Sequence, residues 1–312
     1  MHFIAVRSSS SGYVWADNWA DGSRLLSGQS WEDETTMGST SEGPTLPDFS
    51  QPPVSEVVLG VQFEPLAGLT AAYIGQLWGD FREKFPFTDD RHPLEPAYEI
   101  EDEFSARGNA SVEIELTSAA PLVRAWFLSE SREQLLQVQR DRFIHNWRKM
   151  ESHSAYPRYA SLLHAFKAEF EHFIDFAKKN ELGAVRTVQC EVTYVNHLEA
   201  DQWWQSHREV EKIFQLQLNY SDLPQLEDFR FYQRHILRVA DQFVGRLHVS
   251  VEPVKRLPDG VPAFTVRLTA RGAPLSTGLD GVYSFFALGR ESIVRGFTGL
   301  TTPAMHEAWG LK

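Results

Sequence analysis

The sequence contains a single cysteine, Cys190, in 312 residues, and this excludes an internal disulfide. A lone thiol is typical of a reducing compartment, so we expect the protein to be cytoplasmic. The sequence also lacks any apolar run near the roughly 18 residues that a membrane-spanning helix needs. The apolar start, HFIAV, is shorter than the core of a signal peptide. We therefore expect no membrane segment.

Basic residues are scarce as well. The chain has 30 Lys and Arg against 42 Asp and Glu, which gives a net charge of −12. Proteins that bind along nucleic-acid phosphates need a positive surface, so this balance argues against nucleic acid as a partner.

The motifs that identify many enzymes are missing. The sequence has no glycine-rich phosphate loop, no dinucleotide fingerprint, no His-Glu-x-x-His and no nucleophile elbow. His306 and Glu307 lack the second histidine of a zinc helix. Cys190 falls on the inward side of its expected strand, which is typical of a small core residue rather than a nucleophile. We predict no cofactor, no metal site and no catalytic residue, and we favour a binding protein over an enzyme.

The composition is otherwise that of a globular protein, with 42% hydrophobic residues and nine Trp. Residues 1–50 differ, because they carry seven acidic and two basic residues and show no periodicity. We expect 1–50 to be a disordered or extraneous N-terminal tail, with Met37 as a candidate natural start. The alternative is a docking segment formed by Trp15, Trp19 and Trp31.

The rest of the chain shows the same order of patterns twice, in residues 51–182 and 183–312. Alternating and helical spacings predict, in the first half, a strand through 57–63, a helix from Thr70 to Pro86, strands over 98–104, 110–117, 122–128 and 132–149, and a long helix over 157–180. In the second half they predict a strand over 188–194, a helix over 201–214, strands over 229–238, 242–253 and 263–270, and helices over 277–300 and 302–310.

This order predicts an α+β fold built from duplicated β-α-β(3–4)-α units. We expect both units to fuse into one globular domain, with one curved antiparallel sheet and helices on one face. TATA-binding-protein-like and helix-grip folds have this order of elements. A fold analogy carries no function by itself.

The stretch 132–149, REQLLQVQRDRFIHNWRK, has apolar residues that change sides near its middle. Leu136 and Val138 fall on one face of a strand, but Phe143 and Trp147 fall on the other. We predict a single long strand with a β-bulge near residues 140–142, because a bulge shifts the alternation by one residue.

Four segments together resemble a sporadically distributed bacterial family of uncharacterised proteins. They are PPVSEVVLGVQF, QVQRDRFIHNWRK followed by YPRY, CEVTYVNH, and the terminal GRESIVRGFTGLT. The resemblance runs from about Pro52 to Gly310, which implies that residues 1–36 lie outside the common domain. It implies no activity or ligand.

The outward face of the predicted sheet collects polar side chains. A water-facing sheet surface with mixed charges is one interpretation of this pattern. The other is a binding surface, since arginines suit planar anions and carboxylates. We expect a non-enzymatic module that binds a protein partner or a small polar ligand; the alternative is an enzyme or small-ligand domain that uses the Arg, Glu and His residues. The candidate binding residues are Arg140, Arg142, Asn146, Arg148, Glu191, His248 and Arg267.

Overall fold

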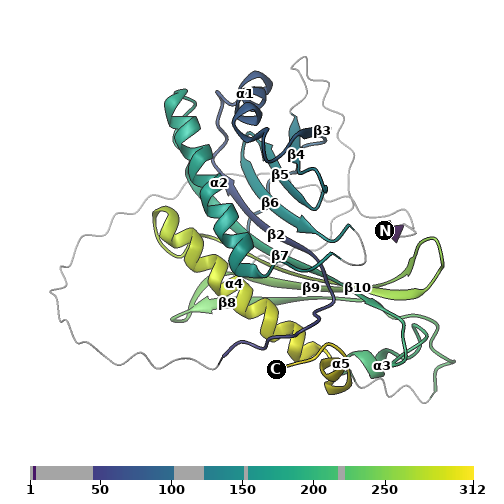
Figure 1. Ribbon diagram of the computed structural model, residues 1–312. Coiled ribbons are helices and arrows are strands. Elements are labelled where there is room, and N and C mark those ends of the chain that lie inside the picture. Colours follow the sequence, from purple (N-terminus) through teal and green to yellow (C-terminus); the bar gives the residue numbers. More distant parts are fainter. Residues whose placement is uncertain (1–2, 5–44, 102–122, 151–153, 217–221) are drawn as a thin grey trace.

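One antiparallel sheet forms the centre of the molecule (Figure 1). The computed structural model describes residues 3–4, 45–101, 123–150, 154–216 and 222–312. Within them the sheet has ten strands, of which nine follow the order β1-β9-β10-β7-β2-β6-β5-β4-β3 and the tenth, β8, pairs with β9. The α+β class and the single antiparallel sheet are therefore confirmed. The strand predicted over 110–117 lies outside the described residues.

The elements before residue 183 begin with a two-residue strand near the N-terminus. They are β1 (Phe3–Ile4), β2 (Val54–Phe63), α1 (Ala71–Phe81), β3 (Phe87–Arg91), β4 (Arg124–Leu128), β5 (Gln134–Gln139), β6 (Arg142–Arg148) and α2 (Tyr159–Lys179). Those after it are β7 (Thr187–Glu199), α3 (Val210–Ile213), β8 (Phe231–Val239), β9 (Gln242–Arg256), β10 (Pro262–Gly272), α4 (Gly278–Leu300) and α5 (Pro303–Ala308).

The core lies between the sheet and the two long helices, α2 and α4, which cross the same face (Figure 1). Alternate residues of β2 point toward these helices, as the period of two requires. Phe143 of β6 stacks on Phe173 of α2 with ring centroids 5.2 Å apart, and Phe166 of α2 meets Phe286 of α4 at 5.1 Å. The opposite face of the sheet therefore receives the polar residues.

The prediction of one long strand over 132–149 is wrong. This stretch forms a hairpin, in which β5 and β6 are joined by a two-residue turn at Arg140 and Asp141. Val138 lies directly opposite Phe143, so both side chains share the core face. The reversal of direction, rather than a bulge, explains why the apolar positions change parity.

Two other predicted elements also differ. In place of the helix over 201–214 only α3 is helical. Asp201 N donates to Trp204 O at 2.9 Å, which is opposite to the direction of helix hydrogen bonds, so these residues form a local turn. Residues 98–101, expected to start a strand, pair with none of the described strands. The remainder of that expected strand, 102–104, lies outside the described residues. The short edge strand β3 was not predicted.

The expected tail boundary at residue 50 falls too late. Phe49 is buried against Phe297 and Trp309, with ring centroids about 6 Å from each, and it bridges to Leu311. Phe3–Ile4 pairs with the end of β9. Residues 5–44 lie outside the described part of the chain. Among the described residues, no helix has both the length and the apolar character to span a membrane.

Candidate functional site

Residues 92–101 cross the polar face of the sheet, opposite the long helices, and we call this segment the strap. Its path is fixed by hydrogen bonds to side chains of the sheet rather than by strand pairing. Pro93 and Pro96 lack the N–H groups that a regular ladder would use. The strap therefore covers a surface that alternation alone would leave open to water.

Two glutamines hold the strap backbone. Gln139 of β5 accepts from Leu94 N at 2.9 Å and donates to Leu94 O at 3.0 Å, so its amide imitates a strand partner. Gln62 of β2 accepts from Ala97 N at 3.0 Å. Arg142 of β6 donates through Nη2 to the carbonyl oxygen of Glu95.

Glu99 anchors the other end of the strap on β9. Its side chain is only 6% exposed, and its carboxylate lies 2.9 Å from Arg246 Nη1 and 2.6 Å from His248 Nε2. Arg271 of β10 approaches to 3.7 Å. Burial alone would raise the pKa of Glu99, but the hydrogen bonds and charges of His248, Arg246 and Arg271 outweigh it and lower this pKa. Glu99 is therefore held as a carboxylate.

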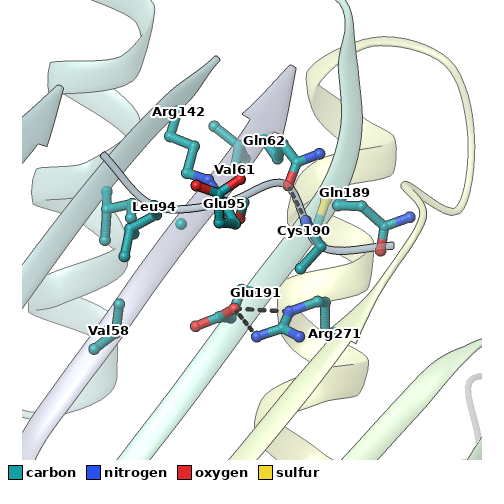
Figure 2. A pocket seen from close by; sticks show the side chains of 13 residues that line it. Val58, Val61, Gln62, Leu94, Glu95, Arg142, Gln189, Cys190, Glu191 and Arg271 are labelled. Carbon is teal, nitrogen blue, oxygen red and sulfur yellow. Dashed lines mark hydrogen bonds and ion pairs between the residues drawn. The ribbon is translucent and has the colours of Figure 1, made fainter. Parts of the chain in front are cut away.

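A cavity of about 250 Å³ lies between the strap and the sheet (Figure 2). Leu94, Glu95 and Ala97 of the strap line one side. The sheet lines the other, where Gly60 of β2 has no side chain to fill the space. A Cβ at Gly60 would lie 3.2 Å from Ile144 Cγ1. A side chain at Gly60 would therefore crowd Ile144, which also lines the cavity.

Three polar side chains stand in a row along one wall. Gln62 pairs in register with Arg142 on one neighbouring strand and with Gln189 on the other. Exposed fractions are 4% for Gln62, 8% for Arg142 and 7% for Gln189. Gln62 Nε2, Arg142 Nε and Gln189 Oε1 have no hydrogen-bond partner among the described residues. Buried polar groups are nearly always paired, so three unpaired atoms around one cavity call for an explanation.

Four charged residues line the cavity, two of each sign, and Glu191 and Arg271 form an ion pair with each other. Glu191 of β7 accepts from Arg271 Nε at 2.9 Å and from Nη2 at 2.7 Å, and Figure 2 shows this double contact. Burial opposes the ionisation of Glu191, but the charge of Arg271 lowers its pKa. No described carboxylate lies within ion-pair distance of Arg142. Burial lowers the pKa of Arg142, partly offset by the charges of Asp141 and Glu191.

The cavity contains two of the seven predicted binding residues, Arg142 and Glu191. His248 lies on the same face but binds Glu99 through Nε2 and Tyr232 Oη through Nδ1, the latter at 2.5 Å. Arg267 is on that face too, exposed and away from the lining.

The other three predicted residues lie elsewhere on β6 and its turn. Arg140 belongs to the hairpin turn, where its Nε lies 3.5 Å from Leu66 O. Asn146 is buried in a network, since it accepts from Gln137 at 2.7 Å and donates to Glu56 at 2.7 Å. Arg148 lies over the Trp126 ring, 5.7 Å from its centroid.

Sequence reasoning missed Glu99 and the strap as parts of the site. The signal available was the spacing of Pro93 and Pro96 in an otherwise apolar and acidic segment, but it does not show which surface the segment covers. Gln62, Gln189 and Arg271 alternate outward on their strands, yet nothing in the sequence distinguishes them from solvated residues.

Metal ligands and a nucleophilic thiol were also sought among the described residues. They contain no group of three His, Cys, Asp or Glu placed to hold a metal ion. Cys190 is buried, and burial raises the pKa of its thiol. The reactive thiolate is thus disfavoured.

Comparison with known proteins gave no match: no family model, no curated protein and no solved structure is significantly similar to this chain.

Proposed function

We propose that this protein is a non-catalytic binding module that takes a small polar ligand into the cavity between the strap and the sheet. The observation that carries the proposal is the row of three buried, unpaired polar atoms on Gln62, Arg142 and Gln189. Each unpaired buried group costs about 1–3 kcal/mol. A chain that folds only for its own stability gains nothing from three of them on one wall, whereas a ligand that pairs them recovers this free energy.

The chemistry of the lining favours binding over catalysis. Glu191 is paired on both of its carboxylate oxygens, by Arg271 and by Thr193 Oγ1 at 3.2 Å, and its lowered pKa makes it a weak base. His248 has both ring nitrogens engaged. The enzyme alternative needs a free base or nucleophile held at the cavity. Glu191 and His248 supply none, and Glu95, the other carboxylate of the lining, is exposed to water.

A thermal-shift screen of small polar compounds tests this function, with Arg142→Met as the site variant and Arg267→Ala as the matched control. Arg267 lies on the same face but is exposed and outside the cavity. A ligand at 100 times its Kd stabilises the folded chain by about 2.7 kcal/mol, or several degrees in Tm. We expect compounds that raise the Tm of the wild type and the control but not of Arg142→Met. Equal shifts in all three proteins, or none in any, would reject the cavity as the site.

A second candidate function is the binding of an acidic protein partner, and one surface favours it. Arg91, Arg124 and Arg148 surround the Trp126 ring, with guanidinium carbons 4.5, 5.7 and 5.7 Å from its centroid. Burial and then neighbouring arginines lower the pKa of Arg124. Carboxylates of a partner would relieve this repulsion. We expect the Arg91→Ala variant to lose capture of the partner and the Arg267→Ala variant to retain it.

We also infer that the fold arose by internal duplication, in the manner of TATA-binding-protein-like or helix-grip folds. The first strands of the two halves, β2 and β7, pair at the centre of the sheet. Outward from them run β6-β5-β4-β3 on one side and β10-β9-β8 on the other. A long helix closes each half. This correspondence supports the duplication.

We also propose that the protein is located in a reducing cytosol, which the single buried thiol of Cys190 supports.

A further inference from the structure

The unpaired groups of the cavity also restrict the chemical class of its ligand, an inference that rests on the function proposed above. Among the charged groups at the cavity, Glu191 and Arg271 neutralise each other through two hydrogen bonds. The Glu95 side chain forms no described ion pair, and its residue is exposed. Arg142 is left as a buried cation whose Nη2 binds only a carbonyl oxygen. Arg142 is therefore the buried charged residue of the lining for which no ion pair is described.

The donors on the wall suit two oxygens of one planar group. Arg142 Nε and Gln62 Nε2 are both unpaired donors on directly opposed residues of neighbouring strands. Side chains at such positions start about 5 Å apart, so two donors can reach the two oxygens of one carboxylate. The orientation of the Gln62 amide is fixed because its oxygen accepts from Ala97 N. The unpaired atom of the Gln62 amide is therefore the donor, Nε2.

Gln189, on the neighbouring strand β7, contributes a hydrogen-bond acceptor rather than a donor. Its Oε1 is buried and unpaired, so it needs an N–H or O–H donor. The rest of the lining includes the apolar side chains of Val58, Ile144 and Leu94, which suit a short carbon skeleton. A 150 Å³ cavity accommodates benzene, so 250 Å³ accommodates about ten non-hydrogen atoms.

We propose that the ligand is a small carboxylic acid with about ten non-hydrogen atoms and one hydroxyl, amino or amide donor, whose carboxylate binds Arg142 and Gln62 and whose donor binds Gln189. An inorganic phosphate would fill less of the cavity, would leave the apolar wall uncovered and would bring more negative charge than Arg142 neutralises.

The test is isothermal titration of the full chain with carboxylic acids of up to ten non-hydrogen atoms that carry a hydroxyl or amide. 4-Hydroxybenzoate is one probe, and the same compounds as neutral primary amides form the matched set. Inorganic phosphate is a further probe. We expect the acids that bind to do so at least tenfold more tightly than their amides and more tightly than phosphate.

Three variants locate the contacts. Arg142→Met should lower the affinity for the acids at least tenfold. Arg142→Lys should retain only part of the wild-type affinity, because a lysine cannot present the planar fork of a guanidinium. Gln189→Leu should remove the preference for acids that carry a donor over the same acids without one, such as benzoate. Arg267→Ala should bind as the wild type does.

The outcomes separate the ligand class from the function. If neutral amides bind through Arg142 as tightly as the acids do, the proposed ligand class is wrong, but the proposed function as a binding module stands. Phosphate that binds more tightly than every acid would also overturn the ligand class. If no compound of either set or of the thermal-shift screen binds, both the ligand class and the proposed function fail.

Discussion

Replacing Glu99 by Gln removes the charge that holds the strap on β9, and the size of the effect follows from its surroundings. The carboxylate is 6% exposed and contacts Arg246 and His248 at 2.9 and 2.6 Å. The Arg246 side chain is itself only 10% exposed. Removing one partner of a buried ion pair costs about 3–5 kcal/mol, since the other charge stays buried without compensation. Arg246 keeps its hydrogen bond to Ile100 O at 2.7 Å, so we expect about 3 kcal/mol.

Urea unfolding of the wild type and of Glu99→Gln at pH 7 measures this cost. Glu95→Gln is the matched control, because Glu95 lies in the same strap but is exposed and forms no described ion pair. We expect the control to stay within about 0.5 kcal/mol of the wild type. A loss below about 1 kcal/mol for Glu99→Gln would refute the anchoring of the strap by this carboxylate.

The pH dependence of the difference gives a second readout of Glu99. Its pKa is lower in the folded chain than its ordinary value, so its contribution is complete above the unfolded-state pKa of about 4.3. The contribution is lost as the pH falls through the lower folded-state pKa. The gap in unfolding free energy between wild type and variant should therefore be constant near neutrality and shrink below about pH 4. A gap that grows on acidification would contradict this sign.

Three further stability predictions follow from buried polar groups. Asn146→Ala should cost about 1–3 kcal/mol in urea unfolding, because it removes a hydrogen-bond partner of the buried Gln137 and of the half-buried Glu56, and a neutral result would contradict the network. Glu169→Gln should cost about 3–5 kcal/mol, since Glu169 on α2 binds His145 Nδ1 and Lys84 Nζ, each at 2.6 Å, and a loss under 1 kcal/mol would contradict this pairing. Arg142→Ala should cost less than Asn146→Ala in the ligand-free chain, and the reverse order would make Arg142 structural.

Periodicity predicted much of the sheet and both long helices. The alternation in β2, β9 and β10 and the phenylalanine stripe of α2 report burial on one face, and burial is the main cause of such patterns. The β5–β6 hairpin was missed because its turn, Arg140-Asp141, contains neither the Gly nor the Asn that usually marks a two-residue turn.

The site could be predicted only in part. Arg142 and Glu191 were identified because outward alternation and residue type select them. The strap could not be, because its contacts join residues 45 positions apart, as between Leu94 and Gln139, or 149 apart, as between Glu99 and His248. That Gln62 and Gln189 carry unpaired atoms is a property of the folded neighbourhood. No local pattern in the sequence encodes it.

The central claim is that Arg142 meets a ligand in the cavity, and ¹⁵N NMR of arginine side chains measures this directly. A carboxylic acid that binds in titration is added to the labelled full chain, and the Nε–H resonances of Arg142 and Arg267 are followed. We expect the Arg142 Nε–H signal to shift with the occupancy of the ligand and to exchange more slowly with water, while the Arg267 signal stays unchanged. A saturating acid that leaves Arg142 unchanged and shifts Arg267 or the arginines around Trp126 would contradict it.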